Sequence, residues 1–128
     1  MTKLEEKNPD EHRPGEALEA ARAWAAGKIK MRPTQRKILD CHTLAKELDS
    51  KEDIALCHAV GQACAVVHTA GHAIGYPMYD LSVIIYRLGI ESCAEAVGQR
   101  RWEYVRKLFY WNEHIGDYEG EWAGFMLK

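Results

Sequence analysis

The longest apolar stretch of the chain runs from Ile54 to Gly75 and predicts a helix at about residues 52–75. Its few polar side chains are spaced so that they share one narrow stripe of a helix with 3.6 residues per turn. These side chains are His58, Gln62, Thr69 and His72. A helix that is apolar on its other sides belongs in the middle of a domain. We therefore predict an all-α fold in which this segment is the central, mostly buried helix.

A second row of positions on the same predicted helix carries mostly small side chains. The row consists of Gly61, Cys64, His68, Gly71 and Gly75, at steps of three and four residues. Small side chains let a neighbouring helix approach closely, because little lies between the two backbones. Leucine at Gly61 or Gly71 should therefore overpack this contact and destabilise the protein.

Two helices are predicted before the central one. The first begins at Pro14 and stops at Gly27, because proline suits a first helical turn and glycine suits a helix end. Its buried face is predicted to be Leu18, Ala21, Trp24 and Ala25. The second begins near Pro33, with an apolar stripe of Ile38, Cys41, Ala45 and Leu48.

The ends of the central helix are also marked. Asp49 or Ser50 is placed to cap its first turn, because both side chains accept hydrogen bonds from backbone N–H groups. Pro77 should end it, because a proline disfavours helical geometry at the preceding residue, Tyr76.

The C-terminal part of the chain predicts further helices. Leu81–Leu88 contains β-branched residues that suit a strand or a helix, but a lone strand would have no pairing partner, so we expect a helix closed by Gly89. Ser92 and Glu95 have the spacing of a capping box and should open the last long helix. Its inward side chains are predicted to be Val97, Trp102, Val105, Leu108 and Phe109, and the tail should hold one short helix.

These elements make a single-domain bundle of at least five helices. A chain of 128 residues is the size of one domain. We assign the helical domain to residues 14–128. Residues 1–13 are polar and contain an early proline, so we expect them to form a flexible arm.

Composition and charge restrict the possible partners. The chain has 17 Lys and Arg against 19 Asp and Glu, for a formal net charge of −2, so nothing in the balance calls for nucleic acid or a membrane surface. Three histidines and a glutamine in the apolar stretch argue against a membrane span. Residues 1–13 show no export signal, so we expect a cytoplasmic protein with four reduced, buried cysteines.

Candidate catalytic and metal-binding groups are few. His68 and His72 stand at i and i+4, as metal ligands do, but Thr69 occupies the position of the glutamate that a metalloprotease needs. Cys57 and His58 are adjacent on a helix and so do not face each other as a catalytic dyad would. We predict no enzyme, no cofactor and no metal. The alternative is a bundle that binds a metal or small ligand at the seam formed by His58, Gln62, His68 and His72.

The C-terminal tail interleaves aromatic and acidic residues. Such a surface suits binding to a basic protein, because aromatic side chains supply contact area and acids steer the approach. The predicted contact residues are Asp117, Tyr118, Glu119, Glu121 and Trp122. The competing interpretation is an aromatic clamp that packs the last helix onto the core, and the sequence alone leaves both open.

The chain also resembles a known family. The resemblance lies in residues 36–81, in KLFYWNEH (107–114) and in EWAGFMLK (121–128). These segments are similar to those of small bacterial immunity proteins of polymorphic toxin systems, over roughly residue 12 to the end. The resemblance implies an all-helical cytoplasmic protein that binds and neutralises a cognate toxin domain without catalysis. It leaves the oligomeric state unknown and supplies no functional residues.

Overall fold

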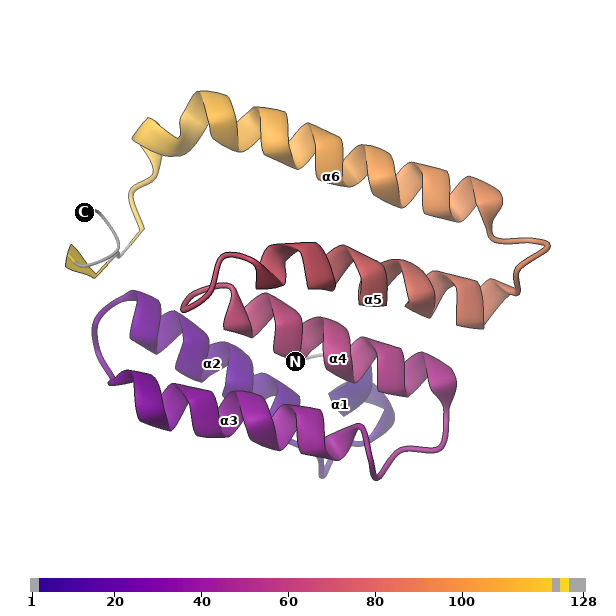
Figure 1. Cartoon of the computed structure of the whole chain (residues 1–128), viewed down its shortest axis with the longest axis horizontal. Helices are drawn as coiled ribbons and strands as arrows, with labels where there is room; N and C mark the ends of the chain where they lie inside the picture. The colour runs from indigo at the N-terminus through magenta and orange to yellow at the C-terminus, as the bar shows by residue number, and fades with distance from the viewer. Residues whose placement is uncertain (1–2, 121–122, 125–128) are drawn as a thin grey trace.

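The computed structural model describes residues 3–120 and 123–124, and all regular structure in these residues is helical. This confirms the predicted all-α bundle of at least five helices (Figure 1). The helices are α1 (Lys3–Lys7), α2 (Arg13–Ala25), α3 (Met31–Leu44), α4 (Lys51–Ala65), α5 (His72–Leu88) and α6 (Ala94–His114), followed by the 3₁₀ turn η1 (Ile115–Asp117).

The first long helices follow the sequence signals. Pro14 lies in the first turn of α2, and Gly27 follows its end with a positive φ of 76°, a conformation that glycine adopts without steric cost. The side-chain hydroxyl of Ser50 accepts a hydrogen bond from the backbone N–H of Asp53, which confirms the predicted cap of α4. Local chemistry therefore sets where these helices begin and end.

The hydrophobic core lies among α1, α2, α3 and α4. Its buried members are Leu4, Ala17, Ala21, Ile38, Cys41, Leu44, Ala45, Cys57, Cys64 and Ala65. Many are alanine or cysteine, so the four helices can pack closely, and α4 contacts α2 and α3 on one side and α5 on the other (Figure 1). In α5, by contrast, only Val83 is buried, and no residue of α6 is.

The predicted central helix at 52–75 is wrong in its extent. α4 ends at Ala65, residues 66–71 form turns, and α5 begins at His72 and runs back beside α4 (Figure 1). The β-branched residues Val66, Val67 and Thr69 followed by Gly71 have low helix propensity, and the fold-back lets α4 pack against a second helix.

The predicted stop at Pro77 is also wrong. Pro77 lies inside α5, in its second turn. Proline lacks the N–H that would bond the carbonyl of Ala73, and Ala73 is exposed, so water can satisfy that carbonyl. Leu81–Leu88 is helical as predicted, and Gly89 closes α5 with a φ of 84°. α5 therefore joins two segments that were predicted to be separate.

The N-terminal segment contacts the bundle. Lys3–Lys7 lies within the stretch expected to be a flexible arm, but it forms α1, and the Leu4 side chain is only 1% exposed. The ammonium group of Lys7 lies 2.7 Å from the Asp53 carboxylate at the start of α4. Residues 3–7 are thus part of the packed structure, while the assignment of residues 14–128 as one domain stays a prediction.

The last long helix differs most from its prediction. Cys93 stands at the N-cap of α6 without a side-chain cap bond, so the predicted capping box of Ser92 and Glu95 does not form. The predicted inward side chains are largely exposed: Trp102 by 66%, Leu108 by 73% and Phe109 by 66%. In the described residues, no helix is long and apolar enough to cross a membrane.

Candidate interaction surface

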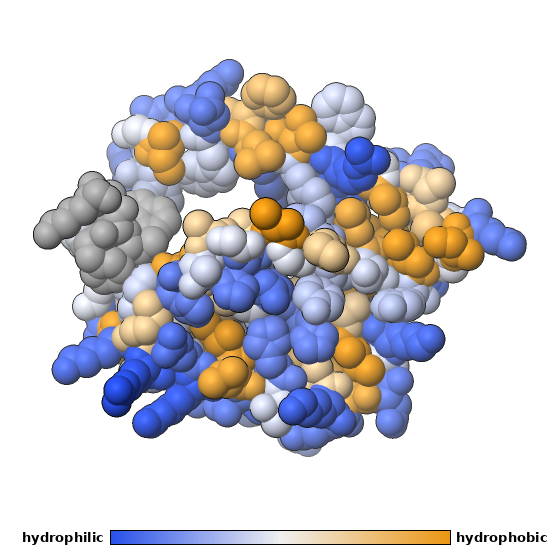
Figure 2. All heavy atoms as spheres, viewed as in Figure 1, coloured by the Kyte–Doolittle hydropathy of each residue, from blue (hydrophilic) through white to orange (hydrophobic). Residues whose placement is uncertain are grey.

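One side of α6 carries an exposed apolar stripe that no other helix of the described chain covers. Trp102, Val105 and Phe109 follow one another at i, i+3 and i+7, so they share one face of the helix. We call these three residues the outer stripe. At 100° per residue, Arg101 borders it on one side and Arg106 on the other. Figure 2 shows hydrophobic side chains gathered along the edge of the molecule where α6 lies.

A second apolar stripe of α6 faces α5 without reaching it. Leu108, Trp111 and Ile115 continue the line of Tyr104, whose hydroxyl donates a hydrogen bond to the Asp80 carboxylate of α5. Arg100 also approaches Asp80, at 3.4 Å. Burial and Asp80 raise the pKa of Tyr104, so this phenol stays a donor.

Beyond this polar tie, the two helices separate. The side chains of Leu108, Trp111 and Ile115 are 73%, 44% and 59% exposed. Figure 2 shows an opening between α6 and the rest of the molecule. The attachment of α6 to the bundle therefore rests mainly on the contacts of Tyr104 and Arg100 with α5.

The predicted tail contacts lie beside the end of α6. Asp117 and Glu119 are exposed, and the Tyr118 ring lies 5.8 Å from that of Trp111 in an edge-on arrangement. Tyr118 also lines an apolar groove of about 620 Å³ between α2 and α4, which includes Leu18, Cys64 and Val67. Glu121 and Trp122 lie outside the described residues.

The tail returns to the end of α2. The backbone N–H of Ala123 donates to the carbonyl of Ala25 at 2.5 Å, and Ala123 is buried. Tyr118 and Ala123 therefore both contact the bundle, as an aromatic clamp would, while Asp117 and Glu119 stay available to a partner.

Residues of the histidine seam form hydrogen bonds with one another, with the neighbouring Thr69 and with a histidine of α3. His58 lies with its Nδ1 atom 3.0 Å from the Nδ1 of His42, and His72 Nδ1 lies 2.8 Å from the Gln62 Oε1. His68 Nδ1 lies 3.0 Å from the Thr69 hydroxyl. Burial lowers the pKa of His42, and its neighbours His58 and His72 lower it further. The polar stripe is thus satisfied by other side chains, most of them half-buried.

Two glycines make room for this seam. A Cβ atom at Gly61 would lie 2.5 Å from the His42 ring, and one at Gly75 would lie 2.5 Å from the Gln62 amide oxygen. The small side chains at these positions therefore leave room for polar side chains of α3 and α4, where a close approach of helix backbones was predicted. Gly71 is exposed, and a Cβ atom there would meet nothing within 4 Å, so its predicted role in close packing is wrong.

Metal binding at the seam gains no support. Within residues 3–120 and 123–124, no group of three or more His, Cys, Asp or Glu side chains is placed to hold a metal ion. His42, which the sequence had offered with Cys41 as a further ligand, and Tyr79, which it had not, flank His58, with the Tyr79 ring 5.0 Å away. These contacts join three helices, and the spacing of residues along one helix gives no signal for them.

Comparison with known proteins assigns the chain to a family. Residues 1–107 match the family model described as Imm-5 like putative immunity protein. The chain belongs to the Imm-5-like immunity protein family. No curated protein and no solved structure matches it.

The Imm-5-like match covers α1 to α5 and α6 as far as Lys107. It therefore includes the core, the histidine seam and two residues of the outer stripe, Trp102 and Val105. Residues 108–128 lie beyond it, although the resemblance in the sequence extended to the chain end. The positions of Phe109, Trp111 and Tyr118 therefore come from the structure of this chain alone.

Proposed function

We propose that this protein acts in the cytoplasm as a non-catalytic immunity protein that binds a cognate toxin domain and blocks it. Membership of the Imm-5-like family supports a toxin as the partner in general terms. The observation that carries the proposal is the outer stripe of α6, Trp102, Val105 and Phe109, which lies exposed on a helix with no buried residue.

The outer stripe has the properties of a binding surface. Single exposed hydrophobic residues are normal, but contiguous apolar patches on a soluble protein indicate interaction sites. Trp and Arg are the residues most often responsible for binding energy at interfaces, and Arg101 lies beside Trp102 in a shallow groove on α6. Covering Trp102 and Phe109 would remove large apolar areas from water, which favours association.

The charges around the outer stripe specify the partner's chemistry. Arg101 and Arg106 border the stripe, and Lys107 lies further round the helix. All three are exposed. Cations at the rim of an apolar patch are complementary to carboxylates. The toxin surface that meets α6 is therefore apolar at its centre and acidic where it meets Arg101 and Arg106. The exposed Glu95 and Glu113 continue the same face beyond the two ends of the stripe, so the partner surface is not acidic there.

The acidic tail forms a second predicted contact. Asp117, Tyr118, Glu119, Glu121 and Trp122 follow α6 directly, so one partner could meet both regions. The tail would take a basic patch of the same toxin. Reversing the charge of Asp117, Glu119 and Glu121 should then slow association strongly at low salt and much less at high salt, because salt screens exposed charges.

The test titrates this protein against the cognate toxin domain that the proposal requires. Trp102→Ala should weaken binding by tenfold or more in a titration, and cells that express the toxin should lose protection. Leu39→Ala is the matched control, because Leu39 is a 63% exposed apolar residue on α3, away from α6. Full affinity in a Trp102→Ala, Phe109→Ala double variant would exclude the outer stripe as the interface.

A further inference from the structure

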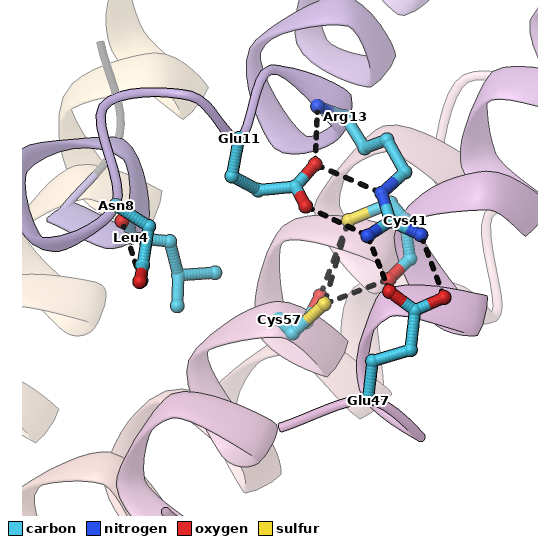
Figure 3. A network of polar contacts seen from close by, with 7 residues as sticks. All are labelled: Leu4, Asn8, Glu11, Arg13, Cys41, Glu47 and Cys57. Carbon is cyan, nitrogen blue, oxygen red and sulfur yellow. Dashed lines mark hydrogen bonds and ion pairs between the residues drawn. The ribbon is translucent and has the colours of Figure 1, made fainter. Parts of the chain in front are cut away.

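Two buried thiols from neighbouring helices face each other in the core. Cys41 of α3 and Cys57 of α4 have their Sγ atoms 3.8 Å apart, and both residues are fully buried. Each thiol also lies near the other residue's carbonyl: Cys57 Sγ is 2.7 Å from the Cys41 oxygen, and Cys41 Sγ is 3.6 Å from the Cys57 oxygen. Figure 3 shows the two sulfur atoms between the helices.

The distance between the sulfur atoms suits bond formation. A disulfide has an S–S length of about 2.05 Å, so the sulfurs need to approach by less than 2 Å, which side-chain rotation and a small helix shift supply. Cys64 is a poor rival partner for Cys57, because seven residues on one helix separate them by about 10 Å along the axis. The structure therefore favours one cross-link, between α3 and α4.

The two thiols differ in their ease of ionisation. The hydrogen bond between them lowers the pKa of Cys57, and the charge of Arg13 lowers it further, against burial and Glu11. The same pairing and burial raise the pKa of Cys41. Since the thiolate is the nucleophile, Cys57 is the thiol that reacts first with an oxidant.

A cluster of ion pairs lies beside the thiols at the surface. The guanidinium of Arg13 lies 2.7 Å from the Glu11 carboxylate and 2.6 Å from the Glu47 carboxylate (Figure 3). These contacts tie the loop before α2 to the segment after α3. The Arg13–Glu47 pair is the more exposed of the two and should contribute little to stability, so local opening here would give small oxidants a route to Cys57.

We propose that Cys41 and Cys57 form a dithiol that peroxide converts into a disulfide joining α3 to α4. The Cys57 thiolate attacks one oxygen of hydrogen peroxide, the O–O bond breaks, and Cys57 sulfenic acid and hydroxide result. The hydroxide takes up the proton that the Cys57 thiol released, which gives the first water. The Cys41 sulfur then attacks the Cys57 sulfur and displaces a second water. In total the two thiols lose two protons and two electrons, which together are two hydrogen atoms, and one peroxide is reduced to two waters.

The first test is the mass of the intact, folded chain. Treatment with hydrogen peroxide should remove two hydrogen atoms, and digestion without reductant should give one cross-linked peptide pair that contains Cys41 and Cys57. A Cys64→Ala, Cys93→Ala variant should behave in the same way. Peroxide products on the unsubstituted chain that consist only of oxygen additions, or a cross-link through Cys64 or Cys93, would overturn the proposal.

The second test addresses the route of access. Glu47→Ala removes one partner of Arg13 and should raise the oxidation rate several-fold. Glu16→Ala is the matched control, because Glu16 makes a surface ion pair with Lys37 at the same 2.6 Å distance, and neither residue is among the charges that shift the pKa of Cys57. Equal rates for Glu47→Ala and the parent would overturn the assigned route.

The third test is thermal stability. The cross-link would join two positions 16 residues apart in the sequence and so restrict the unfolded chain, which should raise Tm by roughly 5 °C or more. Dithiothreitol should reverse the rise. The Cys41→Ser and Cys57→Ser variants should show no peroxide-dependent rise, whereas a rise in either variant would contradict a bond between these two residues.

Discussion

The N-terminal and C-terminal parts of this molecule differ in whether their apolar side chains are buried. In α1 to α4, apolar side chains such as Leu4, Ile38 and Leu44 are 5% exposed or less. In α6, a comparable apolar stripe remains open to solvent, and α5 buries only Val83. An apolar stripe on a helix therefore indicates that another surface can pack against it. That second surface can belong to the same chain or to a partner.

The difference follows from side-chain size as well as from position. The core of α1 to α4 uses alanine, cysteine and leucine, so its helices approach closely. The bulky residues of α6, among them Trp102, Phe109 and Trp111, would need a wide complementary surface. Large aromatic side chains are enriched in the cores of protein–protein interfaces. Their exposure is what the proposed binding role of α6 requires.

The largest expected effect on stability comes from a substitution in the packed core of α1 to α4. Ile38→Ala should lower the free energy of unfolding by about 2–4 kcal/mol, because the side chain is 5% exposed and its removal leaves a cavity. The adjacent Leu39 is 63% exposed, so Leu39→Ala should change stability by no more than about 0.5 kcal/mol. Urea unfolding measures both, and equal midpoints for the two variants would contradict the packing of α3.

The next test concerns the N-terminal segment. Leu4→Ala should cost about 1–3 kcal/mol, because Leu4 packs in the core from α1. Lys3→Ala is the control, because Lys3 is an exposed residue of the same short helix. Urea unfolding of Leu4→Ala that matches the parent would show that residues 3–7 behave as a flexible arm in solution.

Alanine substitutions at two glycines compare the packed histidine seam with the exposed turn between α4 and α5. Gly61→Ala should destabilise by about 1–2 kcal/mol, because the new Cβ would displace the His42 ring. Gly71→Ala should be neutral or stabilise by up to about 1 kcal/mol, because open space surrounds it and its φ of −58° suits alanine. Thermal unfolding compares the pair, and a larger loss at Gly71 would contradict the break between α4 and α5.

Acid should weaken the seam before the rest of the molecule. The pKa of His42 is lowered by burial and by His58 and His72, so below about pH 6.5 the unfolded chain takes up a proton that the folded state resists. The contribution of His42 to the free energy of unfolding is complete above that pH and is lost as the pH falls toward the pKa of His42 in the folded state. His42→Gln should flatten this dependence in urea titrations, whereas the exposed His12→Gln should leave it unchanged.

The smallest expected effect lies on α6. Trp102→Ala and Phe109→Ala should each change the unfolding free energy by no more than about 0.5 kcal/mol, because both side chains are 66% exposed. A loss of more than 2 kcal/mol in urea unfolding would mean that α6 packs onto the bundle in solution, and the contrast between the two regions would disappear.

Several local features of this protein follow from its sequence alone. Proline and glycine positions predicted both ends of α2, the Ser50 side chain predicted the start of α4, and Gly89 predicted the end of α5. These signals act within a few residues, through backbone geometry and hydrogen bonds to neighbouring N–H groups. Apolar periodicity likewise predicted the buried positions Ala21, Ile38 and Cys41.

Which apolar surfaces meet depends instead on how the helices pack in three dimensions. Residues 52–75 are apolar enough for one long helix, but folding back at residues 66–71 buries α4 against α5, a gain that local propensity does not contain. The pairing of His42 with His58, and of Cys41 with Cys57, likewise depends on the packing of α3 against α4. The exposure of α6 has the same cause, because burial depends on which surfaces the rest of the fold brings within reach.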